Sequence, residues 1–485
     1  MSYAAVIAFL GRLLAAFAAS MLAPAAVGLG YGETTAASVF IATASVTLFI
    51  AIGMIFATQG AERRVQLRGN FLVVVVAWPL LALFGAVPFF FLVADPVLTP
   101  TDAFFEALSG LTTTGATVIS GLDTQGRGVL FWRAWLQWLG GLGTIVLAVS
   151  VLPMLGVGGM QVFRSAMPHG DHATLGARAR RSALALSWVY AGLTLACAGA
   201  LWAAGMPGFD AFGHALSTLS TGGFSTRDAA LGAFDSASIE AVLIVFMLAG
   251  AMNFTLFWAL LHGRPRVLRG DSESHALLAV AVLAALWAAY VLAGQSAVGG
   301  ADALRHGAFA VVSTFTTTGF VTGIAEPWPT ALPILFLALM LIGGSSGSTA
   351  GGVKLMRVFL AIKQGRRELA RLSHPHGVVR IRYGAQTVSE SEVQALWSFF
   401  ALFFASFAAL AIVLAGLGLD ARGAVTMALA TLTNSGAGLS LVAGPEASYA
   451  ALPGVTKWVV CLGMLLGRVE FVAVLALLMP MFWRR

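Results

Sequence analysis

One short apolar segment of the chain reads Asp102-Ala-Phe-Phe-Glu-Ala-Leu-Ser-Gly-Leu-Thr-Thr-Thr-Gly115. It lies between two long apolar stretches, 69–93 and 129–156, and it ends in small polar residues and glycine. A helix rises about 1.5 Å per residue and needs about 20 residues to cross a bilayer, so this segment is too short to span one. We therefore predict that it enters the membrane as a short helix and returns through an extended loop.

The same pattern occurs four times. The second copy, Asp210-Ala-Phe-Gly-His-Ala-Leu-Ser-Thr-Leu-Ser-Thr-Gly-Gly223, matches the first at Asp, Ala, Phe, Ala, Leu, Ser and Leu in one register. The third copy runs over 302–319 and the fourth over 420–436, each with a longer distance between its Asp and its Gly. Because Asp is a preferred N-cap residue, we expect it to begin each short helix. A fourfold repeat at intervals of roughly 100 residues predicts four similar units around one centre.

Composition places the whole chain in a membrane. Of its 485 residues 59% are hydrophobic and only 10% are charged, which is too few charges to cover a soluble core of this size. The first apolar stretch is too long for the apolar region of a signal peptide, so we expect it to be retained. Ten full spans are predicted, at 4–30, 36–58, 69–93, 129–156, 183–205, 237–262, 275–296, 329–361, 394–418 and 453–482.

The predicted fold is an all-α integral membrane protein with ten transmembrane helices. Four re-entrant pore loops lie in pseudo-fourfold helix–pore-loop–helix repeats, and a two-helix hairpin precedes them. The expected units are the N-terminal hairpin 1–68 and the repeats 69–181, 182–270, 271–390 (whose second helix is broken) and 391–485.

The net charge of +7 is informative through its placement, because cationic residues gather in a few short gaps between spans. By the positive-inside rule these gaps and both chain ends are expected to be cytoplasmic. Their position between spans argues against a nucleic-acid-binding surface. Cys197 and Cys461 lie inside apolar spans, so we expect packing residues and no disulfide or metal pair. The main clusters are Arg63, Arg64 and Arg68; Arg164, Arg178, Arg180 and Arg181; Arg264, Arg266 and Arg269; Lys354 to Arg382; and Arg484 with Arg485.

The four loops have the composition of a cation filter. Irregular backbone at membrane depth is tolerated only beside protein or a water-filled cavity, so four such loops are expected to converge on one aqueous centre. There, rings of carbonyl oxygens replace the hydration shell of a monovalent cation, and glycine permits the backbone angles that this requires. A helix-packing surface is the alternative for small residues in one segment, but four copies too short to span argue against it. The predicted filter residues are Thr113, Thr114, Gly115, Thr221, Gly222, Gly223, Thr317, Thr318, Gly319, Asn434, Ser435 and Gly436.

The predicted span 329–361 is interrupted by Gly343-Gly-Ser-Ser-Gly-Ser-Thr-Ala-Gly-Gly352. Each glycine costs a helix about 1 kcal/mol relative to alanine, and broken helices at mid-membrane mark binding or gating sites. We expect a loop below the filter that obstructs the pore, and a glycine-rich helix contact is the alternative. Lys354 is expected either to end this loop or to extend towards the membrane surface. The predicted gating residues are Gly343, Gly344, Ser345, Ser346, Gly347, Ser348, Thr349, Gly351, Gly352 and Lys354.

Two enzyme motifs coincide with this loop. Residues 343–347 satisfy G-x-S-x-G, but a serine hydrolase needs a histidine at the same depth, and His374 and His376 lie in a basic gap. A phosphate-loop spacing also occurs, but Val353 stands where the motif needs lysine. We therefore predict no enzyme activity.

Arg468 lies within the last predicted span, where a lone charge costs several kcal/mol unless it is paired or faces water. One interpretation is an ion pair with Glu470, although residues two apart on a helix face different ways. The interpretation that we favour is a gate charge beneath the filter, where Arg468 repels cations or contacts the glycine-rich loop.

Taken together, these segments resemble the Trk/Ktr/HKT superfamily of potassium transporters, and within it the bacterial TrkH branch, over essentially the whole chain. The resemblance implies potassium uptake through one pore per subunit in the bacterial inner membrane, a homodimer, and a cytoplasmic nucleotide-binding regulatory subunit of the TrkA type. It implies the gating role of Arg468, potassium as the transported ion and no organic cofactor. Glycine at all four filter positions favours potassium, because relatives with serine at the first position tend to admit sodium. Besides the filter and the gating loop, the matching segments are 132–143, 158–163, Gly250-Ala-Met-Asn-Phe254 and Gly467-Arg-Val-Glu470.

The alternative function is a secondary transporter of a different cation or small solute, which would normally show twofold repetition and no fourfold glycine pattern. Channel-like flux and proton-coupled symport both remain open at this point.

Overall fold

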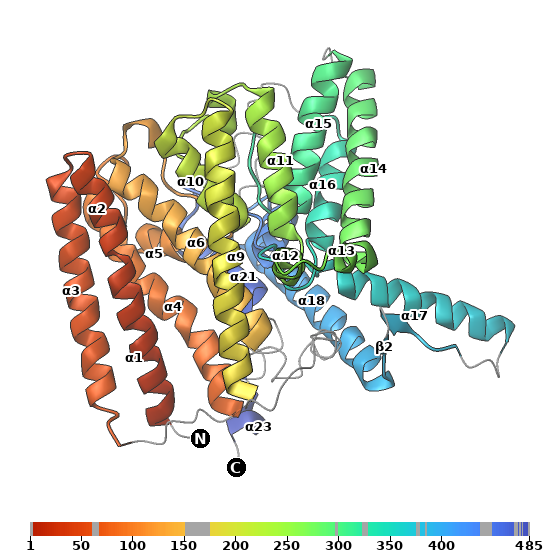
Figure 1. Ribbon diagram of the computed structural model, residues 1–485, viewed down its shortest axis with the longest axis horizontal. Helices are drawn as coiled ribbons and strands as arrows, with labels where there is room; N and C mark the ends of the chain where they lie inside the picture. Colours follow the sequence, from red (N-terminus) through yellow and green to blue (C-terminus); the bar gives the residue numbers. More distant parts are fainter. Residues whose placement is uncertain are drawn as a thin grey trace.

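The structure is a computed structural model that describes residues 3–60, 67–150, 175–295, 299–322, 328–374, 379–383, 386–436, 449–469, 474, 477 and 479–483. These residues are almost entirely helical (Figure 1). A two-stranded antiparallel ladder, β1 (Arg382–Tyr383) with β2 (Gln386–Thr387), is a small departure from the predicted all-α class.

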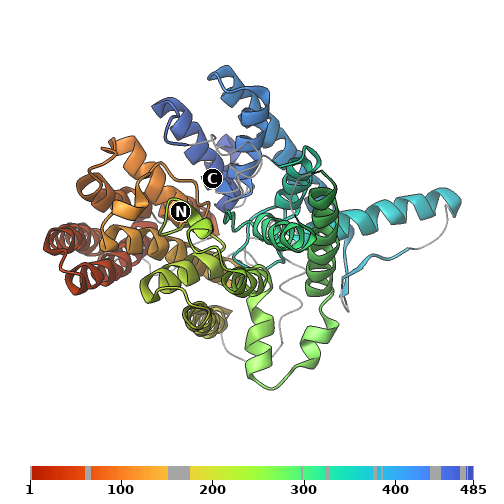
Figure 2. The same ribbon diagram turned by 90° about the horizontal axis from the view of Figure 1, so that it is seen from above.

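The N-terminal hairpin contains three helices, α1 (Tyr3–Ser20), α2 (Leu22–Gly30) and α3 (Thr34–Phe56). The predicted first span is therefore divided at Met21. Figure 2 shows the hairpin in red outside a ring, while the later segments follow one another around a common centre from orange to blue.

Six apolar helical spans within the described residues are long enough to cross a membrane, and a bent pair makes a seventh. The chain is thus a multi-pass membrane protein. The predicted spans 129–156 and 453–482 each extend past the described residues, beyond Ser150 and Val469. Two of the six spans lie in the hairpin, and the other four lie in α4 (Leu67–Leu92), α9 (Leu175–Ala203), α14 (Ser272–Gln295) and α18 (Glu390–Gly416). The other helices include α6 (Arg127–Ser150), α21 (Gly454–Val469) and the short η1 (Leu122–Thr124), η2 (Ala230–Ala233), α13 (Arg266–Gly270) and α23 (Pro480–Trp483).

The four short segments are helices, as predicted. They are α5 (Pro100–Leu111), α10 (Gly208–Leu219), α15 (Gly300–Phe315) and α19 (Ala421–Leu432).

The expected Asp N-cap is correct only for α19, where the Asp420 carboxylate accepts from the Gly423 N–H at 3.2 Å. In the other three helices the Asp lies at the third helical position. Thr99 caps α5 and forms a capping box with Asp102, whereas Pro207 precedes α10 and Gly299 precedes α15. An acidic residue is favourable at either place, because both lie at the positive end of the helix dipole.

These positions of the Asp explain why the Asp-to-Gly distance differs among the four copies. The helix α15 has 16 residues, whereas α5, α10 and α19 each have 12. The longer distance in the third copy therefore comes from an additional helical turn. In the fourth copy it comes from an Asp placed before the helix instead of inside it.

The predicted continuous span 237–262 is wrong. The structure divides it into α11 (Ala237–Ala251) and α12 (Phe254–Leu261), which meet at 99°. Asn253 caps α12, and its side-chain oxygen accepts from the Thr255 N–H at 3.0 Å. The apolar residues around Asn253 hide this boundary in a hydropathy reading.

The predicted break in the span 329–361 is confirmed. The helix α16 (Ala331–Ile342) ends before the glycine-rich loop, defined here as residues 343–354, and α17 (Leu355–Ser373) follows it. Figure 1 shows α17 projecting away from the bundle. The Arg367 guanidinium joins α17 to α18 through two hydrogen bonds to the Glu390 carboxylate, at 2.6 and 3.1 Å.

Two large apolar clusters form the core. One joins the hairpin, α4, α5 and α6 with α18, α19 and α21. The other joins α9, α10, α11, α14, α15 and α16. Two of the short helices, α5 and α19, pack in the first cluster and the other two, α10 and α15, in the second. Cys197 and Cys461 are buried and unpaired, as expected for packing residues.

Candidate functional site

The four short helices end in the same unusual backbone turn. Two residues after each helix the backbone becomes left-handed, with φ of 53° at Thr113, 52° at Thr221, 58° at Thr317 and 51° at Asn434. The N–H of each of these residues donates to the carbonyl three residues earlier, over 2.9 to 3.2 Å. Such a conformation is rare for β-branched side chains, so its recurrence shows that the four predicted segments are structural equivalents.

Glycine follows two residues later, where φ is again positive in the first three copies. The values are 80° at Gly115, 81° at Gly223 and 78° at Gly319. L-residues rarely adopt this conformation, so glycine suits these positions.

A hydroxyl residue directly after each helix stabilises this turn. The side chains of Thr112, Ser220, Thr316 and Thr433 each donate to the carbonyl four residues earlier, in every case at 2.8 Å. These residues are not among the predicted filter residues. The signal for them in the sequence is a hydroxyl residue immediately before all four predicted filter triplets.

The fourth segment also contacts the first directly. The Gly436 N–H donates to the Thr114 carbonyl oxygen at 2.7 Å. The Asn434 side-chain amide donates to the Thr114 hydroxyl at 3.1 Å and to the Met464 carbonyl at 2.9 Å. Asn434 stands where the other copies have threonine, and its longer side chain joins α21 to this junction.

A buried ion pair lies behind the first two segments. The Arg133 Nε donates to the Glu106 carboxylate at 2.8 Å, and both side chains are at most 1% exposed. Arg133 also donates to the Ser225 carbonyl at 2.8 Å and to the Thr117 hydroxyl at 3.1 Å, while the Val118 N–H donates to Glu106 at 2.9 Å. Arg133 of α6 thus holds the chain two residues after Gly115 and two residues after Gly223.

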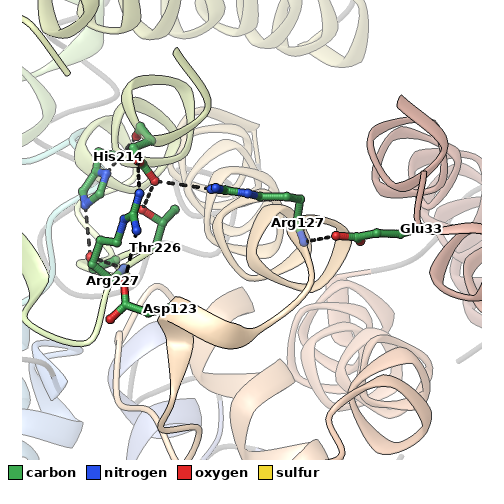
Figure 3. A network of polar contacts seen from close by, with 8 residues as sticks. Glu33, Asp123, Arg127, His214, Thr226 and Arg227 are labelled. Carbon is green, nitrogen blue, oxygen red and sulfur yellow. Dashed lines mark hydrogen bonds and ion pairs between the residues drawn. The ribbon is translucent and has the colours of Figure 1, made fainter. Parts of the chain in front are cut away.

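A second polar network holds the second short helix in place (Figure 3). The buried Asp210 carboxylate accepts from Thr226 at 2.6 Å and from Arg227 at 2.9 Å, and this contact raises the pKa of the Arg227 guanidinium. Arg127 lies 3.8 Å from the same carboxylate, and its backbone N–H donates to Glu33 of the hairpin at 2.6 Å. The hairpin is therefore joined to the centre through the first turn of α6.

The glycine-rich loop lies against the ends of three short helices. The Thr349 hydroxyl donates at 2.9 Å to the carbonyl of Leu219, which is the last residue of α10. The Gly351 N–H donates to the Thr317 hydroxyl at 2.7 Å, and the Gly352 N–H donates to the Thr433 carbonyl at 3.2 Å. A side chain at position 351 would collide with that carbonyl. The loop thus places N–H and O–H donors where the helix dipoles are negative and would otherwise attract a cation.

Lys354 ends this loop directly before α17, with φ of 79°. Its ammonium group turns back and donates to the Ala350 carbonyl at 2.7 Å and to the Ser348 carbonyl at 3.3 Å. The geometry favours a residue that closes the loop over one that extends towards the membrane surface.

Arg468 lies at the same level, on α21. Its guanidinium donates to the Thr349 carbonyl at 3.0 Å and to the Gly140 carbonyl at 3.5 Å, and the residue is 8% exposed. Arg468, Lys354 and Arg357 line a cavity together with Asn434 and part of the loop. Glu470, the alternative partner, lies outside the described residues, as does the matching segment 158–163.

The centre holds carbonyl and hydroxyl oxygens at the four turns, and the cationic side chains of Lys354, Arg357 and Arg468 lie beside the glycine-rich loop. Among the described residues there is no group of three or more His, Cys, Asp or Glu side chains that could hold a metal ion. The His214 ring hydrogen-bonds the Asp210 carbonyl at 2.8 Å and the Ser225 hydroxyl at 3.1 Å, so both of its ring nitrogens have partners within the second repeat.

Comparison with known proteins agrees with this geometry. The family model for TrkH, described as a cation transport protein, matches residues 36–485. The chain belongs to the TrkH family. The predictions of a transporter rather than an enzyme, and of the TrkH branch, are thereby confirmed.

Individual members of the TrkH family match over their full length. The Trk system potassium uptake protein TrkH of Vibrio parahaemolyticus is 42% identical over 490 residues, and that of Escherichia coli K12 is 40% identical over 487 residues, with both chains fully covered in each case. The crystal structure of the potassium transporter TrkH from Vibrio parahaemolyticus superimposes with a TM-score of 0.91 at 40% identity, again over all of both chains. The chain therefore has the TrkH fold.

Proposed function

We propose that this chain takes up potassium ions across the bacterial inner membrane through a single filter made of its four short-helix turns. The observation that carries the proposal is the fourfold recurrence of the left-handed turn at Thr113, Thr221, Thr317 and Asn434. In this proposal the four turns direct backbone carbonyls at one centre, because rings of carbonyl oxygens coordinate a dehydrated monovalent cation without net charge. Full-length relatives described as potassium uptake proteins support potassium as the ion.

The proposed filter residues are the twelve named in the sequence analysis, from Thr113 to Gly436. In this proposal the repeats 69–181, 182–270, 271–390 and 391–485 each supply one quarter of the pore, and 1–68 is an added hairpin. Ten spans then place both chain ends and the basic gaps in the cytoplasm, which agrees with the positive-inside rule.

The glycine-rich loop is proposed as the gate, with Arg468 as the gate charge. The loop donates hydrogen bonds at the ends of α10 and α19 and at the turn after α15. These contacts support an obstructing position of the loop directly beneath the filter. A buried guanidinium on the passage adds an electrostatic barrier, because charges interact strongly where water is scarce. A homodimer and a cytoplasmic nucleotide-binding subunit of the TrkA type are proposed as the assembly that moves this gate.

Radiotracer rubidium uptake tests the transport function. In a bacterial host without its own potassium uptake systems, the chain is expected to restore growth at low potassium and rubidium accumulation that potassium suppresses and sodium does not. In proteoliposomes, flux with and without an imposed pH gradient separates channel-like conduction from proton coupling. A membrane-inserted, folded protein that accumulates neither ion contradicts the proposal.

Deleting residues 345–351 tests the gate separately. Rubidium flux in proteoliposomes without the regulatory subunit is expected to rise, because the obstruction is removed. If a folded deletion variant conducts less than the intact chain, the gate lies elsewhere although the filter assignment stands.

A further inference from the structure

The glycine-rich loop shares its backbone hydrogen bonds with the break between α11 and α12. The Ser345 N–H donates to the Ala251 carbonyl at 2.9 Å, and in the opposite direction the Phe254 N–H donates to the Gly347 carbonyl at 3.3 Å. The Thr349 N–H donates to the Gly250 carbonyl at 3.3 Å, and the Thr349 hydroxyl, which donates to the Leu219 carbonyl, also lies 3.0 Å from the Gly250 carbonyl. Unpaired backbone groups are costly at membrane depth, so each break satisfies groups that the other leaves free.

The break is built to face the loop. Asn253 caps α12 with its side-chain oxygen, which accepts from the N–H and the hydroxyl of Thr255 at 3.0 and 2.8 Å. This cap fixes the 99° bend and leaves the Phe254 N–H free to reach the loop. On the other side, a side chain at Gly250 would come within 3.2 Å of the Leu219 carbonyl, so glycine lets α11 approach the end of α10.

Glu273, at the start of α14, holds the loop from a third direction. Its carboxylate accepts from the Ser346 N–H at 2.8 Å, and the residue is 4% exposed. Within the described part of the chain, the Glu273 side chain has one hydrogen-bond partner, the Ser346 N–H. Without this acceptor the buried Ser346 N–H would have no partner, which is costly in the interior, so this contact helps to fix the position of the loop.

We propose that the gate has two parts. The α11–α12 break holds the glycine-rich loop in its obstructing position through the backbone hydrogen bonds of Gly250, Ala251 and Phe254, which we call the clasp. Glu273 is the positioning residue that keeps the loop in the clasp. The inference rests on the proposed gating function of the loop and extends it. The loop opens by exchanging these hydrogen bonds for others. Any change that weakens the clasp therefore raises the open fraction without touching the filter.

The test is basal rubidium flux in proteoliposomes that hold the purified full chain without a nucleotide-binding subunit. Two variants weaken the clasp: Glu273→Ala removes the acceptor and Asn253→Ala removes the cap of α12. Leaving a buried donor without its partner shifts an equilibrium by roughly tenfold. We expect basal flux to rise about tenfold in Glu273→Ala and by a smaller factor in Asn253→Ala, whereas Glu273→Gln keeps an acceptor oxygen for the Ser346 N–H and should stay close to the intact chain.

Glu392→Ala is the matched control, because Glu392 also accepts backbone and hydroxyl donors from Ser389 but lies in the capping box of α18. Its basal flux is expected to remain that of the intact chain. Thermal unfolding in detergent accompanies each flux measurement. A merely structural role of Glu273 predicts a lower melting temperature and no gain in flux per folded molecule.

The outcomes separate this inference from the gate itself. If deletion of 345–351 raises flux but neither Glu273→Ala nor Asn253→Ala does so in folded protein, the loop is the gate and the clasp is wrong. If the deletion leaves flux low, the proposed gate fails first. A rise in the clasp variants but not in Glu392→Ala supports the two-part gate, and this holds even if Glu273→Ala fails to fold.

Discussion

The guanidinium of Arg468 donates a hydrogen bond to the Thr349 carbonyl oxygen at 3.0 Å, which joins α21 to the middle of the glycine-rich loop. Thr349 in turn donates to the last carbonyl of α10. One chain of contacts therefore runs from the fourth repeat through the loop to the second. A buried cation at this point both fixes the loop and opposes the passage of another cation.

Replacing this arginine by alanine is expected to raise basal rubidium flux about tenfold, the effect of losing one charged hydrogen bond. Lys457→Ala is the control, because Lys457 is a buried cation on the same helix that pairs with Asp102 at 2.6 Å, away from the loop. It should lower the melting temperature and leave basal flux unchanged. If Arg468→Ala instead melts lower and conducts no more per folded molecule, Arg468 is structural and a pair with Glu470 becomes the better interpretation.

Gly351→Ala places a methyl group against the Thr433 carbonyl, so the loop cannot keep its position beneath α19. We expect raised basal flux of the same order as the loop deletion, measured without the regulatory subunit. Gly365→Ala in α17 is the control, because no atom lies within 4 Å of a side chain there. Equal flux in the two variants would show that the close approach at Gly351 does not hold the gate.

Gly115→Ser is expected to let sodium compete with rubidium. The serine disfavours the φ of 80° at this position, and the carbonyls on either side must turn. Competition uptake should show the potassium-over-sodium preference falling several-fold, while Gly192→Ser, on an open face of α9, leaves it intact. Unaltered discrimination in the Gly115 variant argues against the filter assignment.

Arg133→Leu strands the Glu106 carboxylate in the interior, which costs about 3–5 kcal/mol for a broken buried pair. Thermal unfolding in detergent should therefore shift strongly downwards. The double variant Arg133→Leu, Glu106→Leu should recover much of that loss, because no charge is left unpaired. Since Arg133 also holds the Ser225 carbonyl, the double variant should discriminate less between potassium and sodium. A fully selective double variant would limit the pair to a role in stability.

Most of the fold can be predicted from local patterns in the sequence. The four short helices and the break at 343–354 are visible in the sequence because length, glycine content and hydropathy act within a few residues. The break at Asn253 cannot be predicted from hydropathy, because one polar residue in an apolar run lowers the mean too little. A helix N-cap nevertheless needs only one such residue. The Asp register was misjudged since the first turn of a helix accepts an acidic residue at more than one position.

The partners of the site could not be predicted in the same way. Glu273 meets Ser346 across 73 positions in the chain, and Arg133 meets Ser225 across 92. Nothing in the local sequence around either residue marks its partner. Only the closing of the repeats around a centre brings these groups together.

The additional turn of α15 has a consequence for molecules that approach from the face opposite the glycine-rich loop. Four extra residues lengthen this helix by about 6 Å relative to its three counterparts. The turns near the centre repeat closely, yet the N-terminal end of α15 extends one helical turn further from them than do the other three helices. A fourfold-symmetric molecule that binds the N-terminal ends of all four helices therefore cannot contact them equally, whereas an asymmetric one has a single preferred orientation.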